Sequence, residues 1–110
     1  MLESFCWDRM PALQRRAVLK HMISWRIPPN SYKATIEAFL DGGAPVPSGL
    51  KTVGRWHALG SASGWHLVEG DDVEALAQHV AEWAGKIELD VTTVIEDEAA
   101  ASSLSKIYGK

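Results

Sequence analysis

Residues 54–69, GRWHALGSASGWHLVE, decide the fold because two strand-forming stretches flank a short run of small residues, GSAS. This arrangement is typical of a β-hairpin. With GSAS as the connection, we expect His57 to lie opposite His66 and Ala58 to lie near Trp65. A slip of one residue would exchange the two faces. Alternation along each strand predicts one face formed by Arg55, His57, His66 and Val68, and the other by Trp56, Ala58, Trp65 and Leu67.

A strand and a helix are expected before the hairpin. ISWRI (residues 23–27) contains strand-forming residues and stops at two prolines. Asn30 or Ser31 can then cap a helix that ends at Gly42–Gly43. This helix has a predicted apolar stripe formed by Tyr32, Ile36, Phe39 and Leu40.

The residues after the hairpin predict a helix, a strand and a terminal helix. GDDVEALAQHVAEWAG (residues 70–85) reads as a helix capped by Asp71, with Glu74 as its capping-box partner, and ended by Gly85. Its expected apolar face leaves His79 outside, so His79 is predicted to be solvated. KIELDVTTVI (residues 86–95) alternates as a strand does, and residues 96–110 favour a further helix.

The resulting order from residue 21 is β-α-β-β-α-β followed by a helix, which is the ferredoxin-like arrangement of the α+β class. It predicts a four-stranded antiparallel sheet with two helices on one face. The other face would expose tryptophan and aliphatic side chains, which favours burial against a second subunit. We therefore expect a homodimer.

Length and composition fit one small domain, which we place at residues 21–110 of the 110 residues. Residues 1–20 are predicted to be an extension outside it, either an arm produced by an upstream start codon or a docking helix over PALQRRAVLK. The net charge of −3 and the lack of a basic run argue against nucleic acid and anionic membranes as partners. A single cysteine, Cys6, excludes an intrachain disulfide and fits the cytoplasm.

The sequence also resembles a family of small bacterial domains of unknown function in the dimeric α+β barrel superfamily, alongside antibiotic-monooxygenase-like and muconolactone-isomerase-like proteins. Gly54-Arg55-Trp56-His57, Val68-Glu69, Asp71-Asp72, Trp83 and the exit of the strand over residues 91–96 carry the resemblance, which covers about residues 21–101. It implies a ferredoxin-like fold and a barrel formed by two subunits. It implies no activity, because none of the superfamily's catalytic sets matches this sequence.

The hairpin offers the best candidate site. Arg55, His57 and His66 on the interior face of a barrel would form a cationic pocket between apolar walls, suited to a small anionic or aromatic ligand. Alternatively, the tryptophans fill the core and the histidines make structural hydrogen bonds near the sheet rim. Two histidines are too few for a metal site unless Glu69 or a second subunit adds ligands, so we expect neither a metal nor a cofactor.

Two functions remain open on this basis. The first is small-molecule binding in the barrel, extending to cofactor-independent chemistry on a small organic acid or aromatic compound. The second is a non-catalytic dimerisation or regulatory module. A polar-lined cavity in each subunit favours the first, and an interior filled by side chains favours the second.

Overall fold

A computed structural model of the chain describes residues 19–109. They form one antiparallel sheet of four strands with three α-helices and a short 3-10 helix, which places the protein in the α+β class. The elements in chain order are β1 (Lys20–Arg26), η3 (Pro29–Ser31), α2 (Tyr32–Gly42), β2 (Lys51–His57), β3 (Ser63–Glu69), α3 (Val73–Ala84), β4 (Glu88–Val94) and α4 (Asp97–Tyr108).

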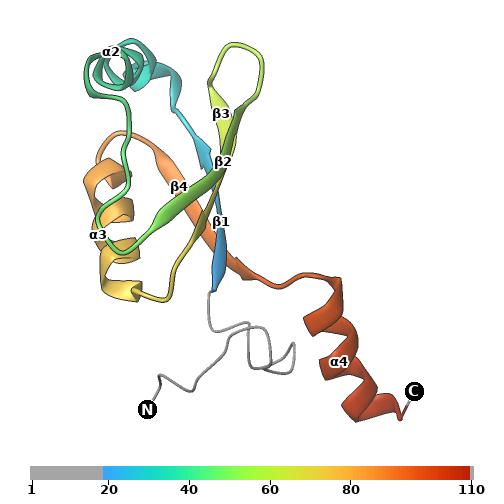
Figure 1. Cartoon of the computed structure of the whole chain (residues 1–110). Helices are drawn as coiled ribbons and strands as arrows, with labels where there is room; N and C mark the ends of the chain where they lie inside the picture. Colours follow the sequence, from blue (N-terminus) through green and yellow to red (C-terminus); the bar gives the residue numbers. More distant parts are fainter. Residues whose placement is uncertain (1–18, 110) are drawn as a thin grey trace.

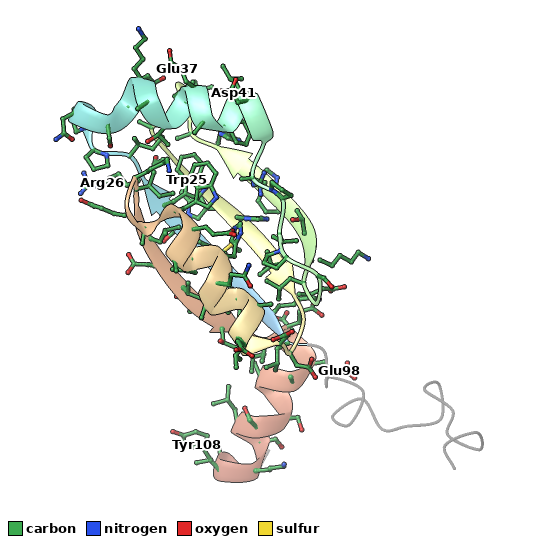
Figure 2. The ribbon with its side chains drawn as sticks, turned by 90° about the vertical axis from the view of Figure 1, so that its left-hand side faces the viewer. Trp25, Arg26, Glu37, Asp41, Glu98 and Tyr108 are labelled. Atoms are coloured by element: carbon green, nitrogen blue, oxygen red, sulfur yellow. The ribbon has the colours of Figure 1, made fainter. Side chains whose placement is uncertain are left out.

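The strands lie in the order β2-β3-β1-β4, so the two strands that are most distant in sequence, β1 and β4, are neighbours. Helices α2 and α3 lie on the same side of the sheet, and the opposite side carries no helix of the described chain (Figure 1). Seen from the helix side, α2 and α3 stand in front of the strands (Figure 2). Helix α4 extends away from the sheet (Figure 1).

Strand β1 is longer than the predicted ISWRI. It begins at Lys20, and the buried His21 within it forms hydrogen bonds across the sheet. Its Nε2 donates to the carbonyl oxygen of Gly70 at 3.2 Å, and its Nδ1 lies 2.9 Å from Thr93 Oγ1. The helix expected over PALQRRAVLK lies outside the described residues, so the nature of the N-terminal extension stays a prediction.

The hairpin is present, but its predicted register is wrong by two residues. Trp56 pairs with Trp65 and Arg55 with His66, whereas His57 lies opposite Gly64. The tight connection is therefore residues 59–62, closed by the hydrogen bond from Ala58 N to Ser63 O at 2.9 Å. Because side chains alternate with a period of two, a slip of two residues leaves both predicted faces unchanged.

A β-bulge at Val53 interrupts the pairing of β2 with β3, which the sequence pattern did not indicate. Thr52 lies opposite Val68, on the helix-covered face, whereas Gly54 lies opposite Leu67 on the open face. Without the extra residue, Thr52 and Gly54 would share one face. The bulge thus brings the Thr52 hydroxyl to the side of the sheet where the helices pack.

The core lies between the sheet and the helices. Ile23 and Val68 are the most deeply buried apolar side chains and pack with Leu76 of α3. Val46, Leu50, Val80 and Leu89 surround them. Ile23 and Leu89 belong both to this packed group and to the wall of a cavity that is also lined by aromatic side chains.

Several predicted helix details are corrected. Asp72, rather than Asp71, caps α3, because its carboxylate accepts a hydrogen bond from Ala75 N at 3.0 Å. Leu40 lies off the buried stripe of α2 and is exposed, whereas Thr35 is buried. The predicted end of α2 is confirmed, because Gly43 follows this helix with a φ of 66°, a conformation that favours glycine.

The hairpin tryptophans do not fill the core of the subunit. Trp56 is 53% exposed and Trp65 is 46% exposed, and both lie on the open face of the sheet. Met22 and Leu67 are neighbours on the same face and are half-buried. The open face therefore carries an apolar centre, as the sequence predicted.

Candidate functional site: a pocket between the sheet and two helices

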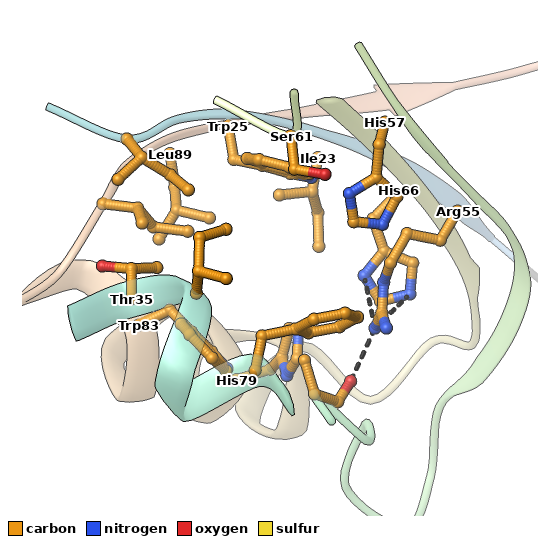
Figure 3. A pocket seen from close by; sticks show the side chains of 15 residues that line it. Ile23, Trp25, Thr35, Arg55, His57, Ser61, His66, His79, Trp83 and Leu89 are labelled. Atoms are coloured by element: carbon orange, nitrogen blue, oxygen red, sulfur yellow. Dashed lines mark hydrogen bonds between the residues drawn. The ribbon is translucent and has the colours of Figure 1, made fainter. Parts of the chain in front are cut away.

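A cavity of about 70 Å³ opens between the sheet and helices α2 and α3 (Figure 3). Its walls are mostly apolar and aromatic side chains, including Trp25, Phe39 and Trp83. Its volume is several times the ~10–15 Å³ that one water molecule requires, yet below the ~300–1,000 Å³ of sites for drug-sized ligands. A molecule of about one ring is the class that fits.

All three residues predicted from the hairpin line this pocket. Arg55 and His57 come from β2 and His66 comes from β3, because these positions share the helix-covered face. The pocket is therefore not on the open face that a second subunit would cover, which corrects the expected position inside a barrel. The role of the three residues in binding stays a prediction.

Arg55 is held in place without a carboxylate. Its Nη2 donates to the carbonyl oxygen of Ala44 at 2.5 Å, and its guanidinium carbon lies 5.9 Å from the centre of the Phe39 ring. No carboxylate of residues 19–109 lies within ion-pair distance of it. Burial lowers the pKa of Arg55, which reflects the cost of keeping this charge partly out of water. The pocket thus contains a cation without a counter-ion from the described chain.

His66 adjoins Arg55 and is 3% exposed. Its Nε2 lies 2.9 Å from Thr52 Oγ1, the hydroxyl that the bulge brings to this face. Arg55 Nη2 makes long contacts of 3.3 and 3.4 Å with the two ring nitrogens, so the guanidinium lies against the ring rather than in one well-directed hydrogen bond. Burial, followed by the charge of Arg55, lowers the pKa of His66 to about 4, and the ring is uncharged at neutral pH.

His79 is a pocket residue that the sequence pattern missed. It was predicted to be solvated, yet it is 4% exposed and lines the cavity from α3. Its ring meets His66 edge-on at 5.6 Å between centroids. Its Nδ1 has no hydrogen-bond partner among the described residues. Burial and the charge of Arg55 lower its pKa, whereas Glu82 raises it.

The remaining polar groups occupy other parts of the pocket. His57 is exposed and lies 5.3 Å from the Trp25 ring and 5.6 Å from the Phe39 ring. The hydroxyl of Thr35 is buried without a partner among residues 19–109, at the end of the pocket away from Arg55 (Figure 3). The arrangement therefore has a cationic end around Arg55 and, toward Leu89, mostly apolar side chains with the Thr35 hydroxyl among them (Figure 3).

Trp25 and Arg26 are adjacent in β1, so only one of them can face the pocket. Trp25 lines it, whereas Arg26 points to the other side and pairs with Glu88 at 2.8 Å. Within residues 19–109, no three histidine, cysteine, aspartate or glutamate side chains gather where they could hold a metal ion. In the same part of the chain, no helix has the length and apolar character needed to cross a membrane.

The lowered pKa of His66 predicts acid sensitivity. An unfolded chain titrates near the ordinary value of 6.5, and the folded protein near 4, so the unfolded state binds more protons between these values. The free energy of unfolding should therefore fall as the pH drops from about 6.5 to about 4, by up to ~3 kcal/mol from this site. Urea unfolding at pH 7 and pH 4.5 measures the change.

The variant His66→Gln should lose most of this pH dependence, because glutamine has no proton to gain in this range. His57→Gln is the matched control on the exposed histidine of the same pocket. An equal pH dependence in the wild type and in His66→Gln would contradict the assignment.

Comparison with known protein families assigns the chain to one of them. Residues 19–108 match a domain of unknown function, DUF3303. No curated protein and no solved structure matches the chain.

Proposed function

Because the chain belongs to the DUF3303 family, which has no assigned function, we propose a function from its pocket: it binds a small molecule with an apolar ring and an anionic group. The observation that carries this proposal is Arg55, a partly buried cation without a carboxylate partner among the described residues. An anionic ligand would supply the missing counter-charge. The aromatic walls would hold its ring.

Because His66 is uncharged at neutral pH, Arg55 is the group beside it that would supply positive charge to an anionic ligand. The guanidinium carries several N–H donors, and its contacts with the His66 ring at 3.3 and 3.4 Å are long, so donors remain for a ligand. Uncharged imidazoles next to a bound acid are also what proton transfer requires. The proposal therefore extends to an enzyme that carries out cofactor-independent chemistry on such an acid.

The finer fold that we propose is the ferredoxin-like one, assembled as a dimeric α+β barrel. The element order and the strand order β2-β3-β1-β4 support it. The open face has an apolar centre formed by Met22, Trp56, Trp65 and Leu67, of the kind that interfaces bury. Ion pairs at its margin, such as Arg26 with Glu88 and Lys51 with Glu69, resemble a polar rim.

Benzoate is the simplest probe of the proposed function, since it has one ring and one carboxylate. We expect it to bind and to change the fluorescence of Trp25 and Trp83, which line the pocket. Benzamide, its neutral analogue, should bind more weakly. The variant Arg55→Met should lower the affinity for benzoate by about 10-fold to 100-fold, the effect of removing a hydrogen bond to a charged group.

Arg26→Met is the matched control, because Arg26 is exposed and lies outside the pocket. It should leave benzoate affinity unchanged. A saturable fluorescence titration or calorimetry measures each affinity. Absence of benzoate binding at millimolar concentration, or an equal loss in both variants, would refute the proposed function.

A further inference from the structure

The His79 imidazole is a buried polar group that the anionic ligand of Arg55 does not explain. It is 4% exposed, it lines the pocket, and its Nδ1 lacks a partner in the described chain. Buried polar atoms without a partner are rare, because each forfeits the hydrogen bonds that water would make. A ring that lines a cavity while its nitrogen lacks a partner can gain that hydrogen bond from a molecule bound in the cavity.

The groups around His79 do not satisfy this nitrogen. His66 of β3 presents its ring edge-on at 5.6 Å between centroids, which is a packing contact. Arg55 of β2 and Glu82 of α3 itself act on His79 through their charges, and no hydrogen bond joins either of them to its ring. Its own helix and the neighbouring strands therefore leave Nδ1 without a hydrogen bond, and a small turn of the ring, which lines the cavity, would present it to a ligand.

We infer that the ligand is a hydroxylated aromatic acid whose hydroxyl group bonds to Nδ1 of His79 while its carboxylate meets Arg55. This inference rests on the proposed function and adds the substrate class. A neutral imidazole presents one N–H and one bare nitrogen, and a hydroxyl both donates and accepts. A hydroxyl is thus the small group that satisfies Nδ1 in either tautomer.

The positions of the two side chains suit a ligand of one ring. Arg55 Nη2 lies 3.3 Å from the ring of His66, and His79 packs against the same ring. Both polar contacts of the ligand are therefore made around a single imidazole. In the close view, Arg55 and His79 lie toward the same end of the pocket, away from Leu89 (Figure 3).

The test compares benzoate with its 2-, 3- and 4-hydroxy isomers by calorimetric titration of the full chain. At least one isomer should bind about 10-fold to 100-fold tighter than benzoate, as expected for a hydrogen bond to a buried group. In His79→Leu, this advantage should disappear, so that benzoate and its three isomers bind with similar affinity. In Arg55→Met, all four compounds should weaken together.

A second measurement on the unmodified protein covers the case in which His79→Leu fails to fold. The ¹⁵N signal of His79 Nδ1 should shift further when the preferred isomer is added than when benzoate is added. Equal affinities of benzoate and all three isomers, or a signal that shifts no further with the isomer than with benzoate, would overturn the hydroxyl inference and leave the proposed function standing. Failure of all four compounds to bind would overturn the proposed function itself.

Discussion

Replacing Trp65 with arginine should give a folded monomer, whereas the wild-type chain should form a dimer of twice the 12.0 kDa chain mass. Trp65 lies opposite Trp56 at the centre of the open face and is 46% exposed in the single subunit. Large aromatic residues at an interface centre commonly contribute at least ~2 kcal/mol each to binding. In the dimer, each subunit would bring one arginine into the interface, and burying two such charges adds repulsion and desolvation cost.

We therefore expect the dimer dissociation constant to rise by at least ~100-fold in Trp65→Arg. Light scattering and sedimentation across a range of concentrations would report this change. Because half of the side chain is already exposed in the subunit, the thermal midpoint of the monomer should change little.

Leu40→Arg is the matched control for dimerisation. Leu40 is 74% exposed and belongs to α2, on the opposite side of the sheet. This variant should remain dimeric. A wild-type chain that is monomeric at micromolar concentration, or a Leu40→Arg variant that also dissociates, would refute the proposed interface.

The two faces of the sheet could be predicted from sequence because they depend only on alternation. The hairpin register was wrong by two residues, yet Arg55 and His66 still appeared together on one face and the tryptophans on the other. The layer that each face meets could not be read in the same way. Which face the helices cover depends on how they pack, and alternation carries no information on that.

His79 shows where helical periodicity fails. A polar residue beside an apolar stripe reads as solvated, but α3 buries His79 together with Ala75 and Leu76. Val73, an apolar residue at the start of the same helix, is 63% exposed, so the buried face does not follow the apolar residues alone. The nearby positive charge of Arg55 lowers the pKa of His79 and so favours its uncharged form.

The Thr52–His66 hydrogen bond could not be predicted from the alternation of the strand residues either. It requires the bulge at Val53, because alternation counted from Arg55 would place Thr52 on the open face. Gly54 beside Val53 is a signal that could have indicated the bulge, because a glycine inside a strand often marks one. Polar contacts of this kind depend on one inserted residue, and alternation alone cannot reveal them.

Gly64→Ala is expected to destabilise the protein by about 3 kcal/mol, at the upper end of the range for overpacked interiors. A Cβ at Gly64 would stand 2.3 Å from the Trp25 ring and 2.4 Å from the backbone oxygen of Trp56. The ring is a pocket wall, and the oxygen belongs to the paired strand, so neither moves freely. The indole of Trp25 lies over this glycine because no side chain occupies the space.

The same substitution should disturb the pocket, since Trp25 also packs edge-on against His57 at 5.3 Å. Urea unfolding measures the loss of stability, and the fluorescence response to benzoate reports the displaced indole. Gly42→Ala is the matched control: a Cβ there meets nothing within 4 Å, and alanine favours a helical position. It should be neutral or slightly stabilising. A Gly64→Ala variant as stable as Gly42→Ala, with an unchanged response to benzoate, would show that Trp25 does not depend on Gly64 for its place in the wall.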